Sequence, residues 1–287
     1  MSSIEQRVSD LRQHIERLGR TSNEQWMASL DERKRKELEF HDAHRDRAKA
    51  ETKIDQDTYE KFYGNKKYYV ATKASREYTS DWIAQHARNS VFLDYACGDG
   101  VNAIAAAKAG ASLSLGLDIS PVSVANATAD AAKASVSGNT CFFQADCENT
   151  KLPDASVDTI ICSGMLHHLD LSYAFPELHR ILRPGGRILA VEALDYNPAI
   201  KLYRMRTPEM RTEWEKSHIL SLKDVKFAER FFKIGEVRYW HVLGIVAPHV
   251  GSFAETLHKI DKVLTRIPYV QRMAWIFTFE LIRHPSA

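Results

Sequence analysis

The stretch LDYACGDG, Leu93–Gly100, decides the expected fold. Apolar residues precede the acidic residue Asp94. A turn that contains Gly98 and Gly100 follows, and after it comes the helix-forming run 101–109. Glycines let the backbone approach a ligand closely, and the unpaired N–H groups at a helix start point toward that ligand. The stretch therefore predicts a buried strand, a tight turn and a nucleotide-like ligand at the carboxyl end of a parallel strand.

Two kinds of nucleotide fit this turn. Gly98, Gly100 and Ala103 match the dinucleotide pattern G-x-G-x-x-A, and Asp118 follows at the distance of a ribose-binding acid. Asp94, however, would repel a pyrophosphate and attract a cation. S-adenosylmethionine (SAM) carries a sulfonium and an ammonium, so the charge of Asp94 favours SAM. An NAD-linked oxidoreductase is the weaker alternative.

Five segments in order resemble the motifs of class I SAM-dependent methyltransferases of the small-molecule type. The first motif of that family, D/E-x-G-x-G-x-G, is matched by Asp94, Ala96, Gly98 and Gly100, with Ala96 replacing its first glycine. The other segments are 116–120, 144–147, 158–169 and 182–189. The resemblance implies a Rossmann-like α/β fold and methyl transfer from SAM.

The resemblance also implies which residues bind the cofactor. Asp94 would hold the methionine ammonium, Asp118 the ribose hydroxyls and Asp146 the adenine amine. Further positions of the same motifs are expected at the cofactor: Ala96, Gly98, Gly100, Ile119, Cys147 and Ser163. Outside the motifs, Tyr63 and Tyr69 are candidates for cation–π contact with the sulfonium, or they simply cover the sheet edge.

Composition narrows the class of protein. A length of 287 residues suits one α/β domain with additions, and a formal charge of +2 argues against a nucleic-acid partner. Four cysteines without a C-x-x-C spacing indicate reduced thiols, and Glu5 and Asp10 argue against a signal peptide. No apolar run approaches the ~20 residues of a membrane span. We therefore expect a cytoplasmic protein.

Strands and helices are expected to alternate through the motif region. Strands are predicted near 91–95, 113–117, 140–144, 157–162 and 186–192, and helices near 101–109, 121–134 and 172–182. This alternation predicts a three-layer αβα sandwich around a mostly parallel sheet. The β-rich segments 232–246 and 274–282, with a helix near 253–265 between them, would complete seven strands, the last of them antiparallel.

Two regions are expected to flank this core. Residues 1–70 should form a helical extension or lid, ahead of a SAM-binding domain at 71–287 whose substrate cap lies at about 195–230, after the fifth strand. Apolar residues near the start follow the spacing of a coiled-coil seam: Ile4, Val8, Leu11, Ile15 and Leu18. The seam predicts either packing on the chain's own domain or a homodimer through this helix.

Methyl transfer requires alignment of the acceptor and, for a hydroxyl or ammonium nucleophile, a general base. His167 and His168 follow the fourth predicted strand and His218 lies in the cap, so each is a candidate base or a structural histidine. Acceptor-binding candidates in the cap are Tyr203, Arg206 and Arg211. No cluster with metal-ligand spacing is visible, so no metal is expected.

Cationic residues outnumber acidic ones in the cap, and aromatic residues lie nearby, which favours an anionic or apolar small-molecule acceptor. The segment 202–211 resembles bacterial methyltransferases of natural-product, glycan and lipid pathways. Methylation of an oxygen is the first prediction. N-methylation, or SAM and S-adenosylhomocysteine (SAH) binding without turnover, are the alternatives.

Overall fold

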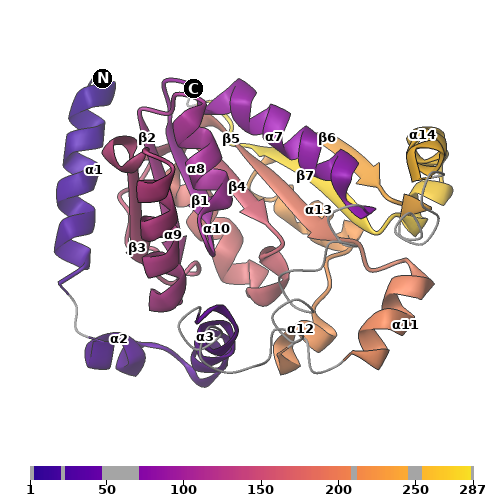
Figure 1. Cartoon of the computed structure of the whole chain (residues 1–287), viewed down its shortest axis with the longest axis horizontal. Helices are drawn as coiled ribbons and strands as arrows, with labels where there is room; N and C mark the ends of the chain where they lie inside the picture. The colour runs from indigo at the N-terminus through magenta and orange to yellow at the C-terminus, as the bar shows by residue number, and fades with distance from the viewer. Residues whose placement is uncertain (1–2, 21–22, 47–70, 208–211, 245–253, 286–287) are drawn as a thin grey trace.

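The computed structural model describes residues 3–20, 23–46, 71–207, 212–244 and 254–285. Its centre is a seven-stranded sheet in the order β3-β2-β1-β4-β5-β7-β6 (Figure 1). The parallel strands are β1 (Val91–Tyr95), β2 (Leu113–Asp118), β3 (Thr140–Gln144), β4 (Val157–Ser163) and β5 (Leu182–Ala193). Next to β5, β7 (Ile276–Ile282) runs antiparallel and pairs in turn with β6 (Lys233–Trp240). The predicted mixed sheet with an antiparallel last strand is confirmed.

Alternating side chains along the strands build a separate core on each face of the sheet. On β1, Leu93 belongs to the larger core cluster and Phe92 to the smaller one. A strand's period of two sends successive side chains to opposite faces. The larger cluster takes in α10 (Leu171–Ile181) and α13 (Leu222–Ala228), and the smaller takes in α7 (Lys73–Ala87) and α8 (Val101–Lys108). Helices therefore cover both faces, which gives the predicted three layers.

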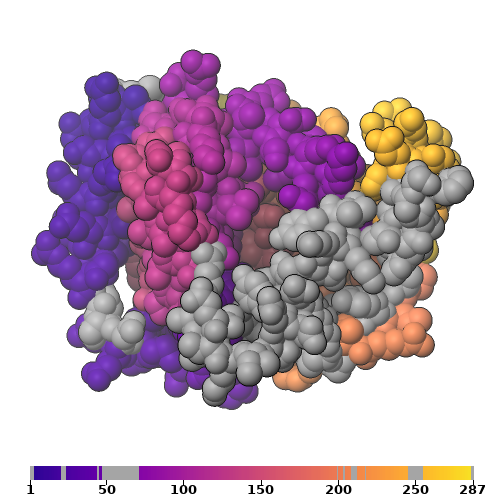
Figure 2. Space-filling view, viewed as in Figure 1, coloured from indigo at the N-terminus to yellow at the C-terminus, as the bar shows by residue number. Residues whose placement is uncertain are grey.

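The first helix, α1 (Ile4–Leu18), packs on its own chain. Leu11 and Ile15 are 3% and 4% exposed and belong to the larger core cluster. Arg7 binds Asp158 at 2.7 Å, and Arg12 donates to the carbonyl of Gly138 at 2.8 Å. In the space-filling view α1 forms one edge of the molecule, opposite α14 (Ala254–Leu264) (Figure 2). The seam therefore packs on the chain's own domain, which is the first of the two alternatives.

The place that α1 takes is explained by the connection between β3 and β4. Residues 145–156, all of them described, form no helix, so that connection leaves its part of the sheet without a helical cover. The imidazole of His14 on α1 lies 2.7 Å from the carbonyl oxygen of Lys151 in this connection. An apolar seam on α1 thus covers a part of the sheet that a crossover helix would otherwise cover.

Among the described residues, three helices lie between β5 and β6: α11 (Pro198–Arg206), α12 (Glu213–Ser217) and α13. The predicted cap at 195–230 includes all three. However, α13 is one of the helices that cover the sheet, since Val225 and Ala228 are buried in the larger core. Phe227 of α13 contacts the ring of Phe175 on α10, with ring centroids 5.8 Å apart. The part of the predicted cap that does not cover the sheet is therefore α11 and α12.

The N-terminal region continues from α1 into α2 (Asn23–Ser29) and α3 (Glu32–Arg45). The predicted boundary at residue 70 lies outside the described residues. Between the described elements α3 contacts α9 (Pro121–Lys133), the helix that covers β2 and β3. This contact brings α3 to the edge of the sheet where the parallel strands end.

All four cysteines are free thiols, as their spacing predicted. Burial raises the pKa of three of them, Cys97, Cys147 and Cys162, well above the ordinary value, so they stay protonated. Among the described residues, none of the helices is both long enough and apolar enough to cross a membrane.

Candidate functional site

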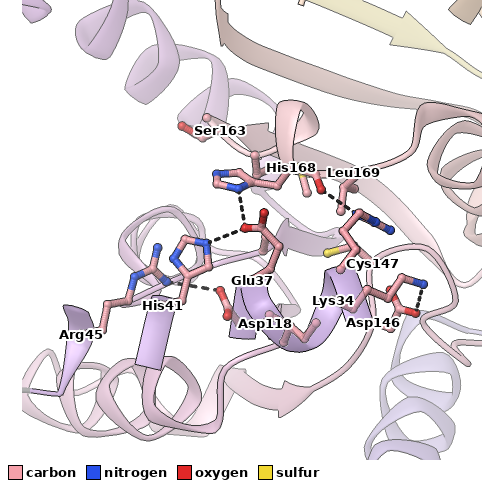
Figure 3. A pocket seen from close by; sticks show the side chains of 15 residues that line it. Lys34, Glu37, His41, Arg45, Asp118, Asp146, Cys147, Ser163, His168 and Leu169 are labelled. Atoms are coloured by element: carbon pink, nitrogen blue, oxygen red, sulfur yellow. Dashed lines mark hydrogen bonds and ion pairs between the residues drawn. The ribbon is translucent and has the colours of Figure 1, made fainter. Parts of the chain in front are cut away.

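A pocket of about 660 Å³, including its mouth, lies at the carboxyl ends of the parallel strands (Figure 3). One wall is α3, and the other residues come from the loops that follow β1, β2, β3 and β4. The predicted cofactor residues that line it are Ala96, Asp118, Ile119, Asp146, Cys147 and Ser163, together with one candidate base, His168. Motifs that are far apart in the sequence therefore meet in a single pocket.

The turn after β1 has an unusual backbone. Ala96, Gly98 and Gly100 have φ angles of 57°, 53° and 75°, in the left-handed region that favours glycine. A Cβ on Gly100 would lie 2.7 Å from the ring of Phe142, so this position requires glycine for space as well. Ala96 has the same left-handed backbone although its methyl group makes that conformation less favourable. It stands at the position where the first motif has its first glycine.

Asp94 lies beneath this turn and is 1% exposed. Its carboxylate accepts the backbone N–H of Ala103, at 3.1 Å, from the first turn of α8. Burial raises the pKa of Asp94 to about 7, against the opposing effect of hydrogen bonds from Asn102 and Ala103. Asp94 and Arg45 line a smaller pocket beside the turn. A carboxylate and a guanidinium in one pocket suit the ammonium and carboxylate of an amino acid.

The other two predicted acids are held by backbone N–H groups. Asp118 at the end of β2 accepts from Gly98 through Oδ2 and from Ser120 through Oδ1, each at 2.9 Å. Asp146 accepts from the N–H of Glu148 at 2.8 Å. These bonds fix both carboxylates at the pocket, where they can accept hydrogen bonds from hydroxyl or amino donors.

Two cations from α3 already contact these acids. Arg45 Nη1 lies 3.4 Å from Asp118 Oδ2, and Lys34 Nζ lies 2.7 Å from Asp146 Oδ2. Burial opposes the charge on Lys34, but its bonds to Asp146 and Glu148 outweigh that and raise its pKa. A ligand that donates to Asp118 and Asp146 would therefore replace ion pairs made by α3.

The two adjacent histidines of the short helix η2 (Leu166–His168) have different surroundings. His168 lines the pocket, with Nδ1 3.0 Å from Glu37 Oε2 on α3. His167 does not line it: Nδ1 lies 2.8 Å from Glu192 and Nε2 lies 3.3 Å from Glu215. Burial opposes the charge on His167, but the two carboxylates raise its pKa to about 9. These carboxylates favour the charged form of His167, which suits a structural ion pair better than a general base.

Three carboxylates organise these histidines, and sequence reasoning missed all three. Glu37 comes from α3, Glu192 from the end of β5 and Glu215 from α12. Glu192 also accepts the N–H groups of Met165 and Leu166, which fixes η2 in place. Although burial opposes ionisation, the bond from His167 lowers the pKa of Glu215 to about 2. The one local signal was the Thr212–Glu215 spacing of a helix capping box, which marks a helix start and not a site.

The remaining candidates lie elsewhere. His218 stacks on Trp214, with ring centroids 3.6 Å apart, and lines a second pocket with His167 and Phe227 instead of the one that holds Asp118. Arg206 is exposed at the end of α11 and lines neither pocket. Tyr203 belongs to α11, and its side chain is not described. Tyr63, Tyr69 and Arg211 lie outside the described residues.

Within the described part of the chain, residues with metal-binding side chains gather in three places, although the sequence spacing showed no such cluster. Two of the groups adjoin the pocket, namely Glu37, His41 and His168, and His167, His168 and Glu215. In both, the imidazoles already pair with carboxylates, so neither group requires an ion. That methyl transfer needs no metal stays a prediction. The third group, His241, His258 and Asp261, is a separate cluster.

Sequence comparison matches part of the chain to known proteins. Residues 93–190 match a family model described as a methyltransferase domain. A stretch of 97 residues is 38% identical to the 27-O-demethylrifamycin SV methyltransferase of Amycolatopsis mediterranei (strain S699), covering 33% of this chain and 36% of that protein. The matches span only 25% to 36% of the curated relatives' own lengths.

Solved structures share the fold across more of the chain. The geranyl diphosphate C-methyltransferase of Streptomyces coelicolor A3(2) aligns with a TM-score of 0.56 and 14% identity, over 80% of this chain and 86% of that one. The [4+2]-cyclase SpnF aligns with a TM-score of 0.52 and 19% identity, over 72% of this chain and 81% of that one. At these identities the likeness establishes the fold alone.

Proposed function

We propose that this chain, whose residues 93–190 form a class I SAM-dependent methyltransferase domain, transfers a methyl group from SAM to a small-molecule acceptor. One observation carries the proposal: a single pocket contains Asp118, Asp146 and His168. The two carboxylates can bind the nucleoside part of the cofactor. The histidine beside them can deprotonate an acceptor. The domain match makes the chemistry specific to methyl transfer.

The described residues fit the polar groups of SAM. Asp118 would accept from the ribose hydroxyls and Asp146 from the adenine amine, in place of Arg45 and Lys34. Asp94 would attract the ammonium, and Arg45 on the other side of the small pocket would attract the carboxylate. When bound, SAM supplies a methyl group already activated by positive sulfur. The protein then has to align the acceptor, exclude water and accept a proton.

We infer transfer to oxygen as the finer reaction, with His168 as the general base. A hydroxyl nucleophile must lose a proton, and an imidazole takes it near neutral pH. Glu37 beside Nδ1 orients the ring, and Glu215 Oε1 lies 3.6 Å from Nε2, so two carboxylates would stabilise the imidazolium that forms. His167 stays bound between Glu192 and Glu215 and acts by fixing the loop.

The acceptor's chemistry is proposed from its surroundings. The second pocket shares Leu169 with the pocket of His168 and is lined partly by Trp214, Leu220 and Phe227. It would suit an apolar or aromatic portion of an acceptor whose hydroxyl reaches His168. The relative named for 27-O-demethylrifamycin SV supports an oxygen acceptor and natural-product biosynthesis. Other related proteins are named C-methyltransferases, so the methylated atom has to be identified directly.

Cofactor binding is the first test. Calorimetric titration with SAM, SAH and NADH should show binding of SAM and SAH and none of NADH. Binding of NADH alone would refute the methyltransferase proposal and restore the oxidoreductase alternative. His168→Asn should retain SAM affinity, because His168 is assigned to the acceptor side.

Turnover is the second test. SAH release is measured with a panel of phenols, alcohols, amines and carbon nucleophiles, using SAM labelled with ¹³C in the methyl group. The carbon chemical shift of the product then distinguishes O-, N- and C-methylation. His168→Asn should lower turnover ~10²–10⁴-fold, and His284→Asn, a change at an exposed histidine, serves as the matched control. Tight SAM binding with no SAH release across the panel would favour SAM binding without turnover.

A further inference from the structure

The cluster of His241, His258 and Asp261 lies apart from the methyl-transfer pocket and has no role in the proposed reaction. His241 directly follows β6, and His258 and Asp261 stand three residues apart on α14, one turn from each other on the same face. One ligand atom of each residue lies within 4.8 Å of the others. His241 and Asp261 are buried, at 2% and 5% exposed, and His258 is half-buried.

The imidazole of His241 is oriented as metal-binding histidines are. Its Nε2 lies 2.8 Å from the hydroxyl of Ser75, so a proton on Nε2 is used there and Nδ1 is left with its lone pair. The backbone of His241 has a φ of 66°, a left-handed conformation that costs energy for a residue other than glycine. A strained backbone thus places the free nitrogen toward Asp261.

Gly244 lies beside both His241 and Asp261. A Cβ on Gly244 would lie 3.1 Å from both His241 Nδ1 and Asp261 Oδ2. A residue with a side chain at this position would therefore press on both candidate ligand atoms. Gly244 does not have a positive φ, so its backbone conformation does not require glycine. The close approach to the two candidate ligands is the structural reason for a glycine here.

Asp261 and His258 supply the other two ligands. The carboxylate of Asp261 accepts the N–H groups of Leu243 and Gly244, at 2.7 and 2.8 Å, and these bonds fix it while each oxygen keeps a second lone pair. His258 Nδ1 is buried and has no hydrogen-bond partner among the residues that the structure describes. A buried nitrogen without a partner is costly, and coordination of an ion would satisfy it.

We propose that His241, His258 and Asp261 bind a zinc ion. Two imidazole nitrogens and one carboxylate oxygen are a ligand set that Zn²⁺ accepts, whereas Mg²⁺ and Ca²⁺ prefer oxygen ligands throughout. The bond that His241 Nε2 donates to Ser75 and those that the loop N–H groups donate to Asp261 form the outer hydrogen bonds that such sites require. Because the ligands join the end of β6 to α14, the ion would stabilise this part of the fold without taking part in methyl transfer.

The test uses the full chain after treatment with a chelator. Zn²⁺ is titrated in competition with a chromophoric indicator, Mg²⁺ is titrated in parallel, and bound metal is counted by mass spectrometry. We expect one zinc ion per chain, no competition by Mg²⁺ and a higher melting temperature with zinc. His258→Gln should weaken zinc binding more than ~100-fold. Gly244→Ala keeps all three ligands and should also weaken it, because its methyl group would press on two of the candidate ligand atoms.

The matched control is His41→Gln, which alters the group at the methyl-transfer pocket and should leave zinc affinity unchanged. Circular dichroism reports whether each variant is folded, and Gly244→Ala tests the site independently if His258→Gln fails to fold. With Co²⁺ in place of zinc, visible absorption typical of a tetrahedral site should be present in the wild type and lost in His258→Gln. Absence of saturable zinc binding, or loss of it in His41→Gln with full retention in His258→Gln, would overturn the proposal.

Discussion

Replacing Asp94 with asparagine should stabilise the fold and at the same time abolish SAM binding. Chiefly because Asp94 is buried, its pKa rises from an ordinary 3.8 to about 7. Each pKa unit corresponds to ~1.4 kcal/mol, so the ionised carboxylate costs the folded state up to about 4 kcal/mol. Asparagine has nearly the same shape and can still accept from the N–H of Ala103, but it carries no charge.

The sign of the effect follows from where the proton is held more tightly. The folded chain binds the Asp94 proton more strongly than the unfolded chain, so the cost is small below pH 4, grows between pH 4 and 7 and is complete above pH 7. For these two pKa values the cost is about 4 kcal/mol at pH 8 and about 2 kcal/mol at pH 5. The stability gained by Asp94→Asn should therefore be larger at pH 8 than at pH 5.

Urea unfolding at both pH values measures this gain, and calorimetry measures SAM affinity. We expect a gain of roughly 2–3 kcal/mol at pH 8, because the buried amide keeps part of the desolvation cost. A variant that is no more stable than wild type at pH 8 would refute the burial argument. A stabilised variant that binds SAM with unchanged affinity would instead refute the assignment of Asp94 to the ammonium.

Three further changes test other parts of the site. Ala96→Gly should hold or raise stability by up to ~1 kcal/mol in urea unfolding, because the left-handed backbone there favours glycine; a clear loss would contradict this. His167→Gln should lower the free energy of unfolding by roughly 3 kcal/mol at pH 6, because the pKa of His167 is raised from 6.5 to about 9. This contribution is fully present below pH 6.5 and is lost as the pH rises through 9. A difference from wild type that does not shrink by pH 10 would exclude this origin. Glu37→Gln should lower kcat for SAH release ~10–100-fold and change its pH profile while SAM affinity stays; the reverse pattern would contradict a positioning role.

The parts of the fold that the sequence predicted are those set by local patterns. β1 and β3 begin and end where the apolar runs do, at 91–95 and 140–144, because a buried parallel strand is a short continuous apolar segment. β5 begins at Leu182 instead of 186, because Leu182 already pairs with Val157 of β4. The register shifts before Arg187 pairs with Thr159, and Gly185 within this irregular segment has a φ of 77°. The acids at the strand ends were predicted for the same local reason.

The partners of His167 and His168 could not be predicted because they come from distant elements. His168 and Glu37 are 131 positions apart, and His167 and Glu192 are 25 apart on different elements. Nothing in the L-H-H-L sequence distinguishes its two histidines; their roles differ because one faces α3 and the other faces the end of β5. The third metal-binding group escaped notice for the same reason, since the fold alone brings the end of β6 to α14.

The helix α3 contributes to both proposed sites, because Lys34 contacts the acid assigned to the adenine and Glu37 contacts His168, the proposed base. If SAM takes Asp146 from Lys34, the lysine keeps a second carboxylate, Glu148, which lies 2.9 Å away. Arg33 also binds Glu148, at 2.5 Å, and donates to the carbonyl of His168 at 2.9 Å. Neither contact of Arg33 involves a group assigned to the cofactor. The helix can therefore give up the adenine site and still keep Glu37 beside His168, which is the arrangement that deprotonation of an acceptor requires.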